Sequence, residues 1–194
     1  MSRLSSEPVP ATEITNLLLT GSPGCGKTTV LKRVAEQFGD LRLAGFLTLE
    51  LREHGQRVGF EAVGLGGRRA ILAHVRFGSP VLVGRYGVET DRLLPVIEEE
   101  LLRPPGTVDA YLIDEIGKME CHCPQFVATM KRLLGEPIPV VSTVALRGGG
   151  FIAEIKQRHD VQIVEVTPAN RQSLPEQIAT WIKQRRTQPN TPLR

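Results

Sequence analysis

A short apolar run that leads directly into a glycine-rich loop constrains this chain more than any other feature. Residues 14–20 (ITNLLLT) have the length and composition of a strand buried on both faces. The loop GSPGCGKT follows at residues 21–28, and the apolar spacing after it predicts a helix over Thr28–Phe38. The glycines therefore lie at a strand-to-helix turn, which is the setting of a phosphate-binding loop. The alternative is a glycine turn that only joins a core strand to a helix.

Each part of this loop matches a charge on a nucleoside triphosphate. Gly21, Gly24 and Gly26 let the backbone curl with its N–H groups pointing inward, and the helix N-terminus adds partial positive charge. Lys27 reaches the β- and γ-phosphates, and the hydroxyl of Thr28 can bind Mg²⁺. The predicted nucleotide contacts in this segment are Gly21, Ser22, Pro23, Gly24, Cys25, Gly26, Lys27, Thr28 and Thr29.

A strand that ends in two adjacent carboxylates is the second chemical signal. Residues 110–113 are apolar, and Asp114 and Glu115 follow, so their side chains should point to opposite faces of the strand. We predict that Asp114 binds Mg²⁺ as a Walker B residue and that Glu115 polarises the water attacking the γ-phosphate. The alternative, an acidic turn at a strand end, is disfavoured by the loop upstream. Predicted nucleotide contacts here are Asp114, Glu115, Ile116, Gly117 and Lys118.

Phosphoanhydride hydrolysis needs positive charge beyond the loop lysine. Arg85 lies between two glycines, and Lys118 closely follows the carboxylate pair, so we predict that both join Lys27 and Glu115 as catalytic residues. Arg147 is a third candidate cation. For each of the three, a solvated surface charge stays open as the alternative.

Strand-like and helix-like segments alternate along the chain, which predicts an α/β fold with a mainly parallel central sheet flanked by helices. Two extended runs after the first helix, separated by His54-Gly55-Gln56, predict a β-hairpin insertion. Its strands are residues 43–53 and 57–65, a third extended run is 70–75, and 81–87 enters a glycine-flanked loop. Further helices are predicted at 91–102, 124–134, 151–158 and from a capping box at 173–176, and further strands at 139–146 and 161–167.

Two hydroxyl residues in the predicted strand 139–146 have two possible roles. Ser142 and Thr143 could sense the γ-phosphate or could simply bond to backbone groups. The sequence leaves both roles open.

Length and composition favour one domain, because 194 residues with 41% hydrophobic content suffice for a single core. We predict a flexible segment at 1–13, a P-loop domain at 14–184 and a disordered tail at 185–194, where apolar periodicity is absent. We expect a monomer.

The remaining composition limits partners and location. A net charge of +3 and few aromatic residues argue for no stable nucleic-acid complex. Three cysteines are too few for a disulfide framework, which favours the reducing cytoplasm, and the spacing of Cys121-His122-Cys123 disfavours a zinc site. No apolar run approaches the ~18 residues of a membrane span, so we expect no membrane association.

The order of motifs resembles that of the small P-loop nucleoside-triphosphatases first described from thermophiles, which include a human cancer-related nucleoside-triphosphatase. The similarity covers about residues 17–182, and DEIGKME is its most specific run; the motifs are TGSPGCGKTT, AGFLTLELRE, VGFEAVGL, VGRYGV, LIDEIGKME and VTPANR. The resemblance implies slow Mg²⁺-dependent hydrolysis of ATP, GTP and other triphosphates to diphosphate and phosphate. Ser22, Cys25 and the segment 121–123 depart from the family pattern and leave substrate preference open.

Two other functions use the same motifs. In a nucleoside or nucleotide kinase, Glu115 would activate an acceptor hydroxyl instead of water, although no arginine-rich lid or acceptor-binding segment is evident. In a nucleotide-dependent switch, hydrolysis would act only as a timer. No guanine-reading triplet and no aromatic pair for adenine is evident, so we expect broad base specificity.

Overall fold

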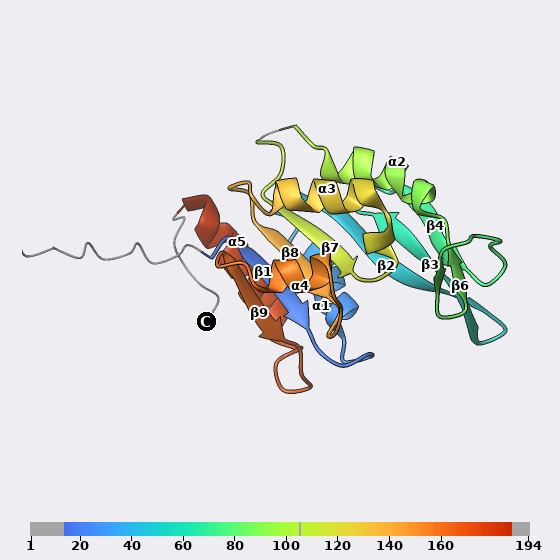
Figure 1. Ribbon diagram of the computed structural model, residues 1–194. Coiled ribbons are helices and arrows are strands. Elements are labelled where there is room, and N and C mark those ends of the chain that lie inside the picture. Colours follow the sequence, from blue (N-terminus) through green and yellow to red (C-terminus); the bar gives the residue numbers. More distant parts are fainter. Residues whose placement is uncertain (1–13, 105, 188–194) are drawn as a thin grey trace, which may run out of the picture.

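One mixed sheet organises the protein (Figure 1). The structure is a computed structural model that describes residues 14–104 and 106–187. Within these residues, nine strands form a single sheet in the order β5-β6-β4-β3-β2-β7-β8-β1-β9. The strands are β1 Asn16–Thr20, β2 Leu43–Glu53, β3 Gln56–Gly64, β4 Arg69–His74, β5 Leu82–Val83, β6 Tyr86–Val88, β7 Ala110–Ile116, β8 Val140–Val144 and β9 Val161–Glu165.

The sheet has a parallel half and an antiparallel half. Strands β2, β7, β8, β1 and β9 pair in parallel, whereas β3, β4, β6 and β5 continue the sheet by antiparallel pairing from β2. The antiparallel strands lie at the right of Figure 1. The predicted fold, a mainly parallel α/β core with a hairpin insertion after the first helix, is confirmed.

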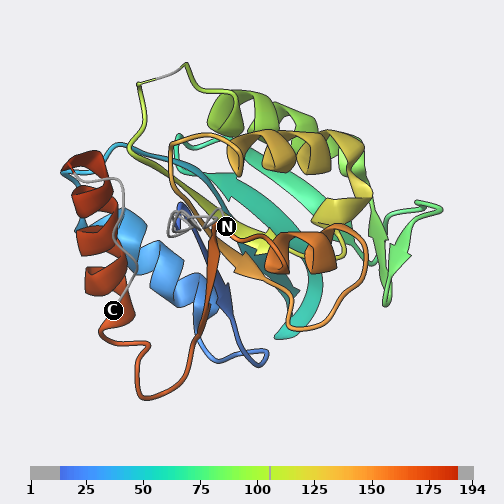
Figure 2. The same cartoon turned by 60° about the vertical axis from the view of Figure 1, so that its left-hand side comes forward.

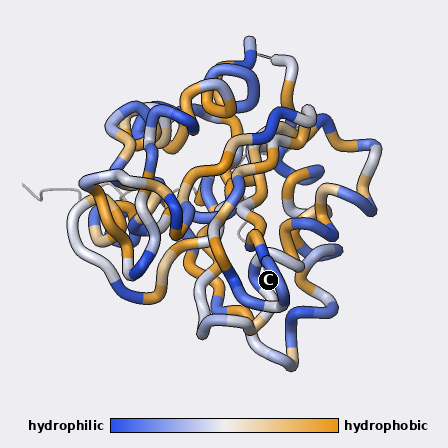
Figure 3. The backbone as a smooth tube through the Cα atoms, turned by 90° about the vertical axis from the view of Figure 1, so that its right-hand side faces the viewer, coloured by the Kyte–Doolittle hydropathy of each residue, from blue (hydrophilic) through white to orange (hydrophobic). Residues whose placement is uncertain are grey.

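Helices cover both faces of the sheet. Figure 2 shows α1 and α5 on one face and α2, α3 and α4 on the other. Two apolar clusters correspond to these faces: Leu31 and Trp181 belong to the first, and Phe126 and Ile152 to the second. Figure 3 shows hydrophobic strand segments inside the molecule and more hydrophilic turns outside. The helices are α1 Lys27–Gln37, α2 Leu94–Val96, α3 Pro124–Leu133, α4 Phe151–Lys156 and α5 Leu174–Thr187, with short turns η1 Thr90–Leu93, η2 Ile97–Leu101 and η3 Glu120–His122.

The hairpin between β2 and β3 forms at the predicted place. His54 has φ 49° and Gly55 has φ 80°, so both turn residues are left-handed, as a tight two-residue hairpin turn requires. Glu53 pairs with Gln56 across this turn.

Two segments between residues 81 and 102 differ from the sequence prediction. The single helix expected over 91–102 is a 3-10 turn, one short α-helical turn and a π-helical turn, and Pro95, which lacks an N–H donor, lies at the start of α2. The loop expected at 81–87 contains strands β5 and β6, because β6 completes its hydrogen bonds on the edge of β4.

The last helix extends three residues into the segment predicted to be a disordered tail. Helix α5 continues to Thr187, and Arg185 donates a hydrogen bond to the Ile14 carbonyl and lies 5.6 Å from the Trp181 ring. Residues 1–13 and 188–194, for which flexibility is predicted, lie outside the described residues.

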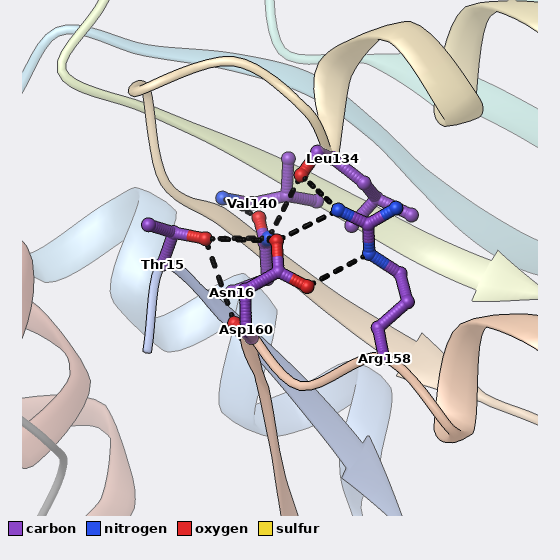
Figure 4. Close-up of polar contacts among 6 residues, drawn as sticks. All are labelled: Thr15, Asn16, Leu134, Val140, Arg158 and Asp160. Atoms are coloured by element: carbon purple, nitrogen blue, oxygen red, sulfur yellow. Dashed lines mark hydrogen bonds and ion pairs between the residues drawn. The ribbon is translucent and has the colours of Figure 1, made fainter. Parts of the chain in front are cut away.

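A buried polar network joins the strands at the end of β1 remote from the glycine loop (Figure 4). The Asn16 amide donates to the Leu134 carbonyl and to Asp160 Oδ2, both at 3.2 Å, and accepts from the Val140 N–H at 3.2 Å. Arg158 donates to the Asp160 carboxylate at 2.7 and 2.9 Å. Asn16 is fully buried, so these bonds satisfy its amide and tie β1 to the segments before β8 and β9.

Candidate active site

The site lies where the parallel strands β1, β7 and β8 end. Strand β8 lies between β7 and β1, and all three run in the same direction. Ligands of open α/β sheets bind at this carboxyl edge. The glycine loop after β1 and the two carboxylates at the end of β7 are therefore close in space although they lie far apart in sequence.

The glycine loop has the backbone conformation that its sequence predicts. Gly21, Gly24 and Gly26 have φ angles of 142°, 76° and 107°, a region that favours glycine. A Cβ on Gly21 would lie 2.9 Å from both Cys25 Sγ and the Val166 carbonyl oxygen. A side chain at Gly21 would therefore disturb both the loop and the segment after β9.

Lys27 lies over this loop and near both carboxylates. Its ammonium donates to the Gly21 and Ser22 carbonyls at 3.0 and 3.2 Å. Its positive charge opposes the upward shifts in the pKa values of Asp114 and Glu115. The structure thus brings the three predicted residues together.

Asp114 is 3% exposed and only partly hydrogen-bonded. Its Oδ1 accepts a bond of 2.6 Å from Thr143, whereas its Oδ2 has no hydrogen-bond partner among the described residues. Burial raises the pKa of the carboxyl, and the hydrogen bond from Thr143, the nearby Thr28 hydroxyl and the charge of Lys27 oppose this shift. A buried carboxylate oxygen without a partner beside the Thr28 hydroxyl fits the oxygen ligands that Mg²⁺ prefers.

The two hydroxyl residues of β8 have different roles. Ser142 donates to the Ile113 carbonyl at 2.7 Å, which is one of the two predicted possibilities. Thr143 instead bonds to the Asp114 side chain. Thr48 on β2 donates to the Asp114 carbonyl and was not identified from sequence, because cross-strand contacts of an insertion leave no local signal.

Glu115 and Glu120 flank Gly117. A Cβ on Gly117 would lie 2.9 Å from Glu115 Oε1 and 2.9 Å from Glu120 Oε2, so a larger residue would displace both carboxyl groups. Burial raises the pKa of Glu115, and the negative charge of Asp114 raises it further. The peptide bond between Asp114 and Glu115 is cis.

Glu120 is a buried acid that the sequence prediction missed. It is 3% exposed, and burial, followed by the negative charge of Glu115, raises its pKa to about 8. The carboxyl is therefore mainly protonated at neutral pH. The only sequence signal was its position at the end of DEIGKME, because burial beside another carboxyl is a tertiary property.

A pocket of about 260 Å³ opens beside Glu115. One wall comes from the insertion, through Thr48, Phe60 and Val83, and Lys118 and Arg147 also line the pocket. Two of the three candidate cations therefore lie beside Glu115.

Arg85 lies elsewhere on the insertion. It follows β5, donates to the Arg57 carbonyl and lies 5.4 Å from the Tyr86 ring. It is not among the residues that line the pocket beside Glu115. Its catalytic role stays a prediction.

A smaller pocket of about 120 Å³ adjoins the other side of the loop. It is lined by Gly26 and Thr29 of the loop and by Arg33, Arg171 and Gln172. Thr29, a predicted contact, thus faces residues of the VTPANR segment and its neighbour, which had no predicted role.

The cysteines form no metal cluster within the residues described. No three His, Cys, Asp or Glu side chains there converge to hold a metal ion. Cys25, Cys121 and Cys123 are free thiols, and burial raises the pKa of Cys121 to about 12. A thiol with so high a pKa is a poor nucleophile. No helix among the described residues has the length and apolar character to cross a membrane.

A glycine loop with its lysine and a buried aspartate on the next strand but one define a P-loop nucleotide-binding protein. The sequence profile of the NTPase family matches residues 16–179, and the chain belongs to this family. The resemblance drawn from the motifs is confirmed.

Named relatives match over nearly their whole length. The nucleoside-triphosphatase THEP1 of Natranaerobius thermophilus is 38% identical over 87% of this chain and 97% of its own. The human cancer-related nucleoside-triphosphatase is 33% identical, over 88% of this chain and 98% of its own length. The crystal structure of THEP1 from Aquifex aeolicus superimposes with a TM-score of 0.76 at 31% identity, covering 87% of this chain and 99% of that one.

Proposed function

We propose that the protein hydrolyses nucleoside 5′-triphosphates to the diphosphate and phosphate in the presence of Mg²⁺. The observation that carries this proposal is the buried Oδ2 of Asp114, which has no hydrogen-bond partner within residues 14–104 and 106–187 and lies beside Thr28 and Lys27, with Glu115 on the adjoining pocket. The names of the relatives support the same activity.

The loop and the carboxylates have different roles in this reaction. The backbone N–H groups of the loop bind the phosphates, and Lys27 neutralises charge on the β- and γ-phosphates. Thr28 and Asp114 are the residues that would hold Mg²⁺, which neutralises charge that develops during phosphoryl transfer.

Glu115 accepts the proton of the attacking water. Its pKa is raised by burial, which makes it a stronger base than an exposed glutamate once it is ionised. Lys118, at the same pocket, supplies positive charge near the transferring group.

Broad base specificity follows from the loop chemistry. Backbone N–H groups recognise phosphates and carry no information about the base. We also propose a monomer in the cytoplasm without a stable nucleic-acid complex. The free thiols and the mild net charge of +3 support these last points.

A panel of nucleoside triphosphates, with phosphate and diphosphate as readouts, tests the proposed function. Free phosphate without any acceptor supports the hydrolase. Tight binding without turnover would instead support the nucleotide-dependent switch.

A further inference from the structure

The pocket beside Glu115 is larger than one attacking water. Its volume is about 260 Å³, whereas one water takes up ~30 Å³. A single water held by Glu115 would suffice for hydrolysis, and the pocket has room for a larger nucleophile.

The wall of the pocket is largely apolar. Phe60, Val83, Met119 and Ala145 line it. The Phe60 ring is held edge to face against Tyr86, with centroids 5.1 Å apart, and Arg57 lies 5.2 Å above it. Apolar side chains cannot orient an attacking water, whereas pockets for small organic molecules combine such walls with a few polar groups.

Lys118 and Glu120 are among the polar residues that line the pocket, and two others match a hydroxyl and an acid. Glu115 is the base of the proposed hydrolysis, and it lines this space. Arg147 also lines it, is exposed, and makes no ion pair with the described residues. A guanidinium at an apolar pocket binds a carboxylate or phosphate on a bound molecule.

The geometry points to a second substrate: the pocket beside Glu115 binds a small alcohol that carries an acidic group, and the γ-phosphoryl group is transferred to its hydroxyl. The inference rests on the proposed function, because the same loop must deliver the phosphoryl group. In this step the alcohol oxygen bonds to the γ-phosphorus, and the bond between that phosphorus and the bridging oxygen of the diphosphate breaks. The hydroxyl proton passes to Glu115, and the nucleoside diphosphate leaves.

The insertion then has a chemical role. Phe60 and Val83 belong to the antiparallel strands β3 and β5, and without these strands this side of Glu115 would be open to water. Hydrolysis is the outcome when water takes the place of the alcohol.

The experiment uses the full chain with Mg²⁺-ATP and two matched probes, 4-hydroxybutanoate and 1-butanol, with products resolved by ³¹P NMR. If the alcohol and water reacted equally well, the ratio of phosphate ester to free phosphate would equal the alcohol-to-water mole ratio in solution. For 4-hydroxybutanoate we expect the product ratio to exceed this mole ratio by at least about 100-fold, because a bound nucleophile has a high effective concentration. The uncharged probe should give at least about tenfold less ester. Arg147→Ala should remove this difference between the probes.

A pair of variants on β5 tests the location. Val83→Phe fills the pocket and should lower the ester-to-phosphate ratio at least about tenfold, whatever the total rate. Leu82→Phe is the matched control, because Leu82 is the adjacent residue, is 64% exposed and does not line the pocket. The ratio should stay unchanged in that variant.

Phosphate release without ester above the mole ratio would overturn the inference and leave the proposed hydrolase intact. An equal change of the ratio in Val83→Phe and Leu82→Phe would overturn the assignment to this pocket. ATP that stays unreacted both with and without the probes would contradict the proposed function as well as the transfer.

Discussion

The Thr143 hydroxyl donates a 2.6 Å hydrogen bond to Oδ1 of Asp114, and the other carboxylate oxygen stays without a hydrogen-bond partner in the described part of the chain. The bond crosses from β8 to β7 and orients a buried charge. One oxygen of Asp114 is thus used for positioning, and the second is left for a cation.

Replacement of Thr143 should weaken Mg²⁺ binding more than it weakens the fold of the P-loop. A hydrogen bond to a charged group contributes about 1.5–3 kcal/mol. Thr143→Val should therefore raise the Mg²⁺ concentration for half-maximal activity by about 10- to 100-fold, and Thr143→Ser should largely restore it. A Mg²⁺ titration of both variants measures this. If Thr143→Val and Thr143→Ser needed the same Mg²⁺ concentration for half-maximal activity, the hydroxyl would have no role in Mg²⁺ binding.

Lys27→Ala should abolish turnover. The substitution removes the charge directed at the β- and γ-phosphates but keeps the loop N–H groups. Phosphate release is the measurement. A rate near that of the wild type would refute the assignment of the P-loop.

The two adjacent acids should give different phenotypes. Glu115→Gln keeps the shape but loses the base, so it should bind Mg²⁺-ATP nearly normally and hydrolyse it at least about 100-fold more slowly. Asp114→Asn should instead weaken the response to Mg²⁺. Nucleotide binding and turnover, measured across a Mg²⁺ series, separate the two. Identical curves would mean that the roles are wrongly assigned.

Glu120 should make the protein less stable as the pH rises. Its pKa is about 8 in the folded protein, whereas an ordinary glutamate has a pKa of 4.5, so between these pH values the folded chain binds more protons than the unfolded chain. The contribution of Glu120 to the free energy of unfolding is largest below about pH 4.5. This contribution decreases as the pH rises toward 8, by up to about 1.4 kcal/mol per pH unit. Glu120→Gln should flatten this dependence. Urea unfolding of both proteins from pH 5 to 8 measures the difference, and parallel curves would contradict the prediction.

Purine and pyrimidine triphosphates should be used with similar efficiency. Without base contacts, discrimination should stay near ~1.4 kcal/mol, and specificity constants should lie within about tenfold of each other. Diphosphates should react poorly because Lys27 and the Mg²⁺ ligands are arranged for a γ-phosphate. Competition assays test both points. A thousandfold preference for one nucleotide would reveal a base pocket, for which the space lined by Arg33 and Arg171 is the first place to look.

Features that depend only on residues next to one another along the chain could be predicted from the sequence. The left-handed glycines of the loop and the His54-Gly55 turn are local backbone preferences, and both have the expected conformations. The alternation of apolar segments was sufficient for the parallel core because buried strands require apolar residues on both faces. The single helix expected over 91–102 was predicted from its apolar spacing, which does not distinguish one type of helical turn from another. The backbone there follows three different hydrogen-bond patterns.

The loop, its lysine and the paired carboxylates are contiguous motifs whose geometry follows from φ angles and from the end of a strand, so the amino-acid sequence alone predicts them. The distant groups that meet these motifs depend on the packed fold. Thr143 reaches Asp114 because β8 pairs with β7, and Glu120 becomes a neutral acid because the fold buries it beside Glu115. The pocket beside Glu115 exists because strands of the insertion, far away in sequence, form its wall. Burial and cross-strand contact are properties of the packed sheet, and no short segment encodes them.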